Sequence, residues 1–199
     1  IHHPLTIDRS TWFEYPSSFF IKMKRVLYYP LFMQKIISNQ MHKIITVSHD
    51  SAREITRAFN VPEKNISVVY NGMDSSLFFP KKGKKRKKNH IIFVGNVEDR
   101  KKGIVYLLKA MTLTKKKVHL TIVDGGAPNR KFVPTWIEKY GLKDRVTFTG
   151  KIPLDELTDL YSEMELAVLP SLYEGFGFPA AEAMACELPV ITTYAGALP

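Results

Sequence analysis

The stretch from Glu174 to Ile191, EGFGFPAAEAMACELPVI, places two carboxylates around a Gly-Phe-Gly turn. The preceding residues, ELAVLPS, form an apolar run typical of a buried strand, and AAEAMAC is typical of the first turns of a helix. Gly175 and Gly177 are therefore predicted to lie at a strand-to-helix junction. Unpaired backbone N–H groups and the helix dipole attract anions at such a junction, so we expect this turn to hold a phosphate.

The two carboxylates, Glu174 and Glu182, would repel a phosphate if they contacted it directly. We therefore expect them to accept hydrogen bonds from neutral hydroxyl groups on either side of it. A molecule that carries hydroxyls on both sides of a phosphate is a sugar nucleotide. The residue types and their spacing thus predict a site for that class of ligand.

Two other interpretations of the same stretch remain open. GFGFPA satisfies the dinucleotide fingerprint G-x-G-x-x-A, which would indicate a nicotinamide or flavin cofactor. That fingerprint expects an acidic residue about twenty positions later, yet YAGALP, which follows PVITT, contains none. In the third interpretation, the glycines only make a turn and both glutamates face solvent.

A diphosphate also requires positive charge, and the segment GNVEDRKKG offers three candidates. Lys102 immediately precedes a predicted helix, and Arg100 and Lys101 are adjacent to it. Lysine is a compact point-charge partner for phosphate oxygens. We expect at least one of these three side chains to reach the turn formed by residues 175–177.

Short apolar strands and amphipathic helices alternate regularly from HIIFVG to PVITT, and KIITVS and NISVVY are earlier strands. This alternation predicts right-handed β-α-β units and a parallel sheet covered on both faces. Ligands of such sheets bind beyond the carboxyl ends of the strands. The loops expected at that rim are Gly95-Asn96, Asp124-Gly125-Gly126, Gly150-Lys151 and the loop of Glu174.

Local signals predict three further features near the N-terminus. SARE, residues 51–54, has the form of a capping box at a helix start, and Asn71-Gly72 indicates a turn. Residues 19–39 have one apolar side and are predicted to be helical, with Pro30 splitting the helix. We expect this helix to pack on a sheet, and an interfacial helix at a membrane is the alternative.

The formal net charge of +10 is concentrated in KKGKKRKK, Lys81–Lys88, which supplies seven charges. Such a run is predicted not to pack and to form a solvated linker between two folded parts, with contact to anionic lipid headgroups as the alternative. It lacks interleaved aromatic residues, so we expect no nucleic-acid binding. No apolar run is long enough for a membrane span. The single cysteine, Cys186, and the scattered histidines predict no disulfide, metal ion or cofactor.

From about Lys43 to Ala197, the chain resembles the retaining GT-B glycosyltransferases of family 4, or group 1. PSLYEGFGFPAAEAMACELPVI matches the E-x7-E signature of that family, with Glu174 and Glu182 as the two acids. NGMDSSLFFP is similar to the family's N-G-V-D-x3-F-x-P bridge between domains. FVGNVEDRKKGIVYLL is similar to its glycine-rich phosphate-binding segment.

The resemblance implies roles for several residues. Glu174 would contact the donor sugar near the reacting carbon, and Glu182 would accept from the ribose hydroxyls. Lys102 would neutralise the leaving diphosphate, and His2, in IHHP, would line the site from the other domain. The other residues implied in donor binding are Gly175, Phe176, Gly177, Gly95, Asn96, Arg100, Lys101, Gly125 and Lys151.

The chain departs from the family pattern at several positions. Asn96 replaces an arginine that normally grips the diphosphate, and we expect Arg100 or Lys101 to substitute for it. Glu187 replaces a common glycine after the helix, which we expect to leave the chemistry unchanged. The glycines of VDGGAP, residues 123–128, are shifted relative to the family pattern.

The sequence thus predicts an α/β protein with two Rossmann-like, doubly wound parallel-sheet domains, both incomplete in an interior piece of a longer chain. Residues 1–80 would end the acceptor-side domain, and residues 81–199 would belong to the donor-nucleotide domain. We expect a metal-independent transfer, with retention, from a UDP- or GDP-linked sugar to a saccharide or lipid-linked acceptor. The piece alone is expected to be inactive, and the whole protein to be cytoplasmic or peripheral at the cytoplasmic membrane face. A non-catalytic sugar-nucleotide-binding protein and a dinucleotide-dependent oxidoreductase are the alternatives.

Overall fold

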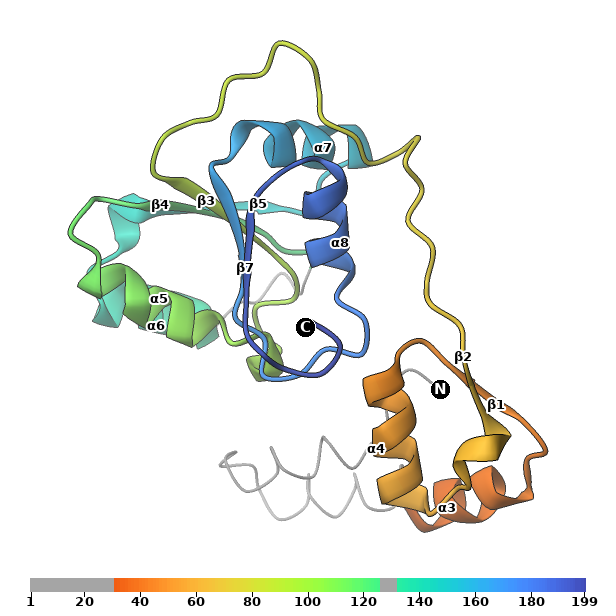
Figure 1. The fold of residues 1–199 in the computed structure, drawn as a ribbon. Helices are drawn as coiled ribbons and strands as arrows, with labels where there is room; N and C mark the ends of the chain where they lie inside the picture. The colour runs from red at the N-terminus through yellow and green to blue at the C-terminus, as the bar shows by residue number, and fades with distance from the viewer. Residues whose placement is uncertain (1–30, 126–131) are drawn as a thin grey trace. The chain divides into compact units, whose positions relative to one another are not determined.

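The fold was obtained as a computed structural model, which describes residues 31–125 and 132–199 of the chain (Figure 1). The chain divides into two compact units, residues 1–71 and 72–199, hereafter unit 1 and unit 2. The helices and strands alternate along both units, as the sequence pattern predicts. Among the described residues, no helix is both long enough and apolar enough to cross a lipid bilayer.

Unit 1 contains two short parallel strands and two helices in its described part. The strands are β1 (Ile44–Thr46) and β2 (Ile66–Val68), and the helices are α3 (Leu31–Gln40) and α4 (His49–Phe59). Parallel pairing sets Ile44 opposite Ile66. A small core of Ile44, Ile55, Phe59 and Val61 joins the strands to α4.

The structure corrects two local predictions in this region. The N-cap of α4 is Ser48, not Ser51, and the Ser48 side chain accepts a hydrogen bond from the Ser51 backbone N–H at 3.1 Å. A serine at the N-cap satisfies one of the unpaired backbone donors of the first turn. Strand β1 ends at Thr46 and α4 begins at His49, so Ser48 occupies the N-cap and Ser51 lies inside the helix. Asn71-Gly72 forms no turn. The turn comes at residues 75–77 instead, where Asp74 accepts from the backbone and the hydroxyl of Ser76.

Unit 2 is a five-stranded parallel sheet in the order β5-β4-β3-β6-β7, which confirms the prediction of an α/β fold with a parallel sheet. Its strands are β3 (His90–Val94), β4 (His119–Val123), β5 (Val146–Gly150), β6 (Leu166–Leu169) and β7 (Val190–Thr192). Its helices are α5 (Ile104–Leu113), α6 (Phe132–Lys139), α7 (Leu154–Glu163) and α8 (Phe178–Ala185).

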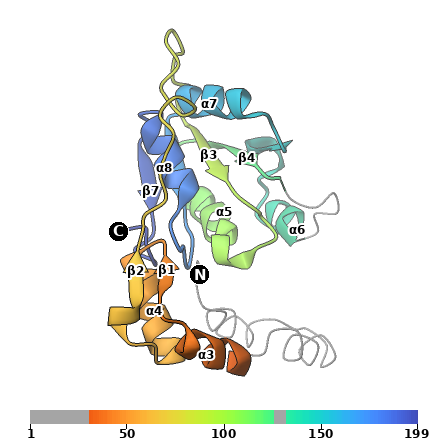
Figure 2. The same ribbon diagram turned by 90° about the vertical axis from the view of Figure 1, so that its right-hand side faces the viewer.

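The sheet of unit 2 is covered on both faces (Figures 1 and 2). Phe93 and Ile122 point to the face on which α5 and α6 pack. Ile92 and Leu169 point to the opposite face, against α7 and α8. Because alternate residues of a buried strand face opposite sides, each central strand contributes to both cores.

The chain leaves α8 through a residue in the left-handed conformation that is not glycine. Glu187 has a φ of 56°, and its N–H donates to the Met184 carbonyl while the N–H of Leu188 donates to that of Ala183, both at 2.9 Å. These two bonds form a Schellman motif, in which glycine is the preferred residue at the position of Glu187. The replacement of glycine therefore affects the backbone of the helix end.

The basic run, Lys81–Lys88, does not form the free linker that the sequence predicted. It lies within unit 2, and the ammonium groups of Lys84 and Lys87 each contact Glu163 of α7 at 2.7 Å. Arg86 donates to the carbonyls of Met164 and Glu187 at 2.8 and 2.7 Å. The carboxylates of α7 and the carbonyls that follow α7 and α8 attract cations, so part of the run packs where composition alone indicated only solvent.

Candidate functional site

The carboxyl ends of all five parallel strands of unit 2 lie at the same edge of the sheet. The sheet order therefore aligns the loops after β5, β4, β3 and β6 along one rim, as predicted. These loops carry Lys151, Gly125, Asn96 and Glu174 respectively. Beyond Gly125, the loop after β4 lies outside the described residues until Phe132.

The loops after β3 and β6 are joined backbone to backbone. The N–H of Leu172 donates to the carbonyl of Lys101 at 2.7 Å. Gly103, with a φ of 67°, packs so closely on this loop that a Cβ would overlap the carbonyl oxygen of Pro170. Only glycine permits this approach, which fixes Lys102, the residue before it, beside the glycine-rich turn.

Lys102 and Glu174 form an ion pair at the centre of the rim. The Lys102 Nζ lies 2.7 Å from Glu174 Oε1, and the Ser171 hydroxyl donates to the same oxygen at 2.9 Å. Glu174 and Ser171 are buried. Among the described residues, none forms a hydrogen bond with Glu174 Oε2. The carboxylate is therefore held through one oxygen and can accept from a ligand through the other.

The segment after β7 holds the backbone of Glu174. The Ala197 N–H donates to the Glu174 carbonyl at 2.9 Å. Gly196, with a φ of 60°, leaves no room for a Cβ because that atom would overlap the same carbonyl oxygen. Residues 196 and 197 therefore fix the position from which the Glu174 side chain starts.

Glu182 lies in α8, one turn beyond the glycine-rich loop. The hydroxyl of Tyr161, from α7, donates to Glu182 Oε2 at 2.9 Å. Burial raises the pKa of Glu182 above its ordinary value, and the hydrogen bond from Tyr161 opposes that rise. Burial, and next the neighbouring Glu182 charge, raise the pKa of Tyr161. The tyrosine therefore stays a neutral donor to the carboxylate.

The remaining cations of the predicted site are placed differently. The guanidinium carbon of Arg100 lies 4.6 Å from the centre of the Phe132 ring, at the start of α6. Burial and the adjacent Lys102 charge lower the pKa of Lys101. Lys102 is bonded to the Glu174 side chain in the loop after β6.

Asn96 and the glycine-rich turn have local roles in the structure. The Asn96 side chain accepts from the Glu98 N–H at 3.0 Å, so it stabilises the turn after β3. The Gly95 N–H donates to the Val123 carbonyl at 3.0 Å.

In the glycine-rich turn, Phe176 and Phe178 flank Gly177 in the sequence, and Gly175 precedes them. The centres of the two phenylalanine rings lie 5.0 Å apart. His2 lies outside the described residues.

Three residues of this site escaped the sequence prediction: Ser171, Tyr161 and Gly196. Ser171 lies three residues before Glu174 in PSLYEG, and this proximity in the sequence could have indicated a role in the site. Tyr161 has the spacing of an ordinary core residue in α7, so nothing in its sequence context connects it with Glu182. The contact between Gly196 and Glu174 joins segments that only the sheet brings together.

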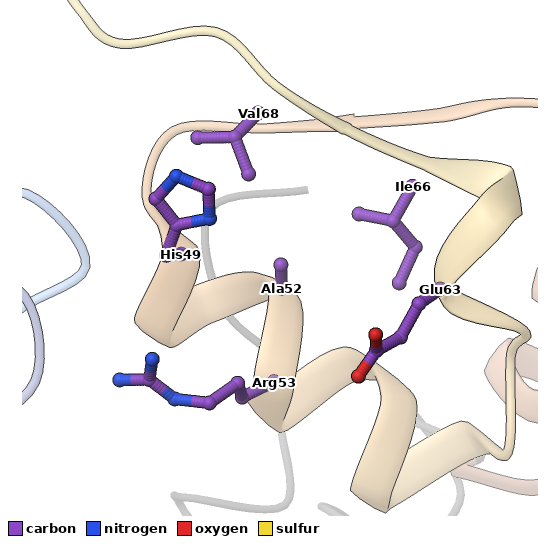
Figure 3. Close-up of a pocket in the computed structure, with 6 residues that line it drawn as sticks. All are labelled: His49, Ala52, Arg53, Glu63, Ile66 and Val68. Atoms are coloured by element: carbon purple, nitrogen blue, oxygen red, sulfur yellow. The ribbon is translucent and has the colours of Figure 1, made fainter.

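Unit 1 carries a separate pocket of about 420 Å³ at the start of α4, shown in Figure 3. Its lining combines polar and apolar side chains: His49, Ala52, Arg53, Glu63, Ile66 and Val68. The Arg53 guanidinium is paired with Asp50 at 3.0 Å. Among the described residues, none of those predicted from the sequence to form the site lines this pocket.

Acidic residues, histidines and cysteines do not gather into a metal site in the part of the chain that the structure describes. No group of three or more of these side chains is close enough to hold an ion there. The expectation of a metal-independent site thus stays a prediction.

Two family models match the chain. The model described as glycosyl transferases group 1 matches residues 74–199, and the model described as glycosyltransferase family 4 matches residues 2–77. The two matches together run almost from one end of the chain to the other and meet near the boundary between the two units.

Two similar curated proteins are mannosyltransferases. An MMP alpha-(1->4)-mannosyltransferase of Mycolicibacterium hassiacum is 35% identical, over 100% of this chain and 48% of its own length. An O-antigen chain mannosyltransferase of Salmonella typhimurium is 34% identical, over 95% of this chain and 51% of its own length. The chain thus spans about half the length of these relatives.

Solved structures share the fold. The sucrose-phosphate synthase of Thermosynechococcus elongatus matches with a TM-score of 0.73 at 30% identity, covering 84% of this chain and 44% of that protein. The Anabaena protein HepE, solved in complex with UDP and glucose, matches with a TM-score of 0.73 at 24% identity, covering 84% of this chain and 48% of its own.

Proposed function

The chain belongs to the group 1 glycosyl transferases and has their GT-B type of fold, and from that membership we propose the reaction of the whole protein. It transfers a sugar from a nucleotide diphosphate to an acceptor hydroxyl, with retention at the sugar carbon and without a metal ion. The bond from that carbon to the diphosphate oxygen breaks, a bond to the acceptor oxygen forms, and the acceptor's proton passes to the departing diphosphate. Residues 72–199 would bind the donor.

The contact that carries this proposal joins Lys102 to Glu174 at the glycine-rich turn, where the Nζ to Oε1 distance is 2.7 Å. The leaving diphosphate gains negative charge as the sugar bond breaks. A lysine beside the N-terminus of α8 would stabilise that charge, and a prearranged cation near developing charge is usually a large contribution to catalysis. Lys102 is the proposed partner of the leaving group.

Glu174 would serve the sugar rather than the phosphate. Its Oε1 is occupied by Lys102 and Ser171, which leaves Oε2 to accept from a sugar hydroxyl. A carboxylate fixed in this way would hold the reacting carbon in place, and positioning of that kind lowers the barrier without any covalent contact. In the donor complex, Lys102 would lie between the carboxylate and the diphosphate.

The second glutamate would recognise the nucleoside. Glu182 lies a turn further into α8 and would accept hydrogen bonds from the ribose hydroxyls. Two carboxylates on either side of a phosphate-binding turn match a ligand with hydroxyls at both ends and charge in the middle. A dinucleotide also carries hydroxyls on both sides of its diphosphate, so the choice of a sugar nucleotide rests on the family match.

The identity of the donor and of the acceptor rests on the relatives. Two of them are mannosyltransferases, one of which acts on the O-antigen chain by its name. We therefore propose a hexose on UDP or GDP as donor and a saccharide or lipid-linked saccharide as acceptor. The proposed location is the cytoplasm, with peripheral contact to the membrane face where such acceptors lie.

The first experiment is calorimetric titration of the full-length protein with UDP-glucose, GDP-mannose, UDP, GDP and NAD. We expect one sugar nucleotide to bind, and Glu182→Ala to weaken it by about 1–3 kcal/mol, the cost of losing a buried hydrogen-bond partner. Glu138→Ala, an exposed glutamate on α6, is the control and should bind like the wild type. Binding of NAD alone would overturn the proposal in favour of a dinucleotide enzyme.

A second candidate function is sugar-nucleotide binding without catalysis. Asn96 favours it, because it stands where the family pattern has a cation for the diphosphate. A transfer assay with the bound donor and a panel of saccharide acceptors separates the two functions, and proton NMR of the product gives its anomeric configuration. Tight binding with no transfer to any acceptor would favour the binding protein.

A further inference from the structure

A buried tyrosine from another helix holds the second glutamate of the signature. Tyr161 is fully buried, with 0% of its surface exposed, and its hydroxyl donates to Glu182 Oε2 at 2.9 Å. We propose that Tyr161 is a positioning residue for donor recognition, which orients the Glu182 carboxylate toward the ribose. This inference rests on the proposed function and adds a residue that the signature itself does not contain.

The fold makes this contact rigid. Helices α7 and α8 pack on the same face of the sheet (Figure 2). The Tyr161 ring belongs to the core cluster of that face, together with Ala183 and Cys186. A ring enclosed on all sides cannot change its rotamer without opening the core. Its hydroxyl is therefore a fixed point for the otherwise flexible Glu182 side chain.

The geometry of the carboxylate fits such a role. Within the part of the chain that the structure describes, the hydrogen bond from Tyr161 is the contact of Glu182 Oε2, and Oε1 has none. A hydrogen bond to one oxygen fixes the plane of the carboxylate and leaves the other oxygen to accept from two vicinal hydroxyls. Glu174 is held in the same manner by Ser171 and Lys102.

The contact also favours the charged form of Glu182 over the neutral one. Burial raises its pKa, and the hydrogen bond from Tyr161 lowers it. In the part of the chain that the structure describes, Cys186 also faces Glu182. Burial and the Glu182 charge raise the pKa of Cys186, and a backbone hydrogen bond at Phe79 and the charge of Lys81 lower it. Removal of the tyrosine hydroxyl would therefore raise the pKa of Glu182, and its neutral form would extend to higher pH.

The test compares wild type, Tyr161→Phe and Glu182→Gln in the full-length protein. Tyr161→Phe keeps the buried ring and removes only the hydroxyl. We expect about tenfold weaker binding of UDP-glucose or GDP-mannose, whichever the wild type binds, as for a lost hydrogen bond to a charged group. KM for the donor should rise with little change in kcat. The pH at which binding is lost on acidification should move upward.

Tyr140→Phe is the matched control, because Tyr140 packs against the core on the opposite face of the sheet. It should leave donor affinity and the pH profile unchanged. If Tyr161→Phe also leaves both unchanged while Glu182→Gln weakens binding, the positioning role is refuted and the proposed function stands.

Failure of the proposed function has a different signature. If the wild type binds no sugar nucleotide, the role toward a ribose is overturned with it. The pKa of Glu182 can then still be read by carbon-13 NMR of labelled glutamates, with Glu182→Gln to assign the signal. A pKa that is the same in wild type and Tyr161→Phe would refute any action of Tyr161 on the carboxylate.

Discussion

The ion pair between Lys102 and Glu174 predicts a pronounced non-additivity between substitutions of these two residues. The substitutions are Lys102→Met, Glu174→Gln and the double variant, each in the full-length protein. Methionine keeps the length of the lysine stem, and glutamine keeps the shape of the carboxylate, so each change removes mainly the charge. The free energy of unfolding in urea and the rate of sugar transfer are the two measurements.

The magnitude follows from the distance and the burial of the pair. At 2.7 Å, the Coulomb attraction is about 6 kcal/mol with an effective dielectric constant of 20. Desolvation offsets much of this, because only 10% of the Glu174 side chain and 26% of that of Lys102 are exposed. A net coupling of about 1–3 kcal/mol remains, within the range measured for residues in one network.

The variants should differ from one another in their free energy of unfolding. Lys102→Met leaves a buried carboxylate whose remaining hydrogen-bond donor, among the described residues, is the Ser171 hydroxyl. We therefore expect this variant to destabilise the protein most, by about 2–3 kcal/mol. The double variant removes both charges and should recover much of that loss. Additive effects within about 0.5 kcal/mol would refute the ion pair as a stabilising contact.

Transfer activity should follow a different pattern. Lys102→Met is expected to lower kcat by about 10²–10³-fold, as for the loss of one stabilising group at a developing charge. The double variant should regain stability without regaining activity. A double variant as active as wild type would show that neither charge takes part in the reaction.

Three other substitutions test the surroundings of the site. Glu187→Gly should raise the free energy of unfolding by about 1 kcal/mol, measured in urea, because glycine adopts the left-handed conformation without strain. Gly196→Ala should displace Glu174 and lower kcat, whereas Gly83→Ala, also at positive φ but with open space around it, should not. Glu163→Gln should flatten the acid side of the stability curve, measured by thermal unfolding between neutral pH and about pH 3. The lysines of the basic run lower the pKa of Glu163, so their contribution is present above its unfolded-state pKa and is lost as pH falls through the lower folded-state value.

Much of the fold of unit 2 could be predicted from local patterns. The strand HIIFVG and the helix LDELTDLYSEM correspond to β3 and α7, and the glycine-rich turn does separate β6 from α8. Periodicity and turn residues act over a few positions, so they are readable along the chain. The N-cap of α4 was assigned wrongly because Ser48 and Ser51 are both suitable residues near the start of the helix. The turn was placed at Asn71-Gly72 because the turn-forming residues Asp74 and Ser76 lie only a few positions later.

The basic run shows where composition misleads. Seven positive charges in eight residues indicate a solvated linker when they are considered alone. Glu163 and the carbonyl of Met164 lie more than seventy positions later in the chain and face this run only once α7 has packed on the sheet. Whether a charged segment packs depends on its partners, and those partners are set by the tertiary structure.

The sequence by itself determined the chemistry that this protein can offer: two acids around a glycine-rich turn, a lysine ahead of a helix, and strands that alternate with helices. Only the tertiary structure decided which groups meet. It joined Lys102 to Glu174 between the loops that follow the neighbouring strands β3 and β6, placed Gly196 against the Glu174 backbone and brought the hydroxyl of Tyr161 to Glu182. Residue types and spacing are properties of the chain, whereas these contacts depend on the order of parallel strands and on the packing of helices over them.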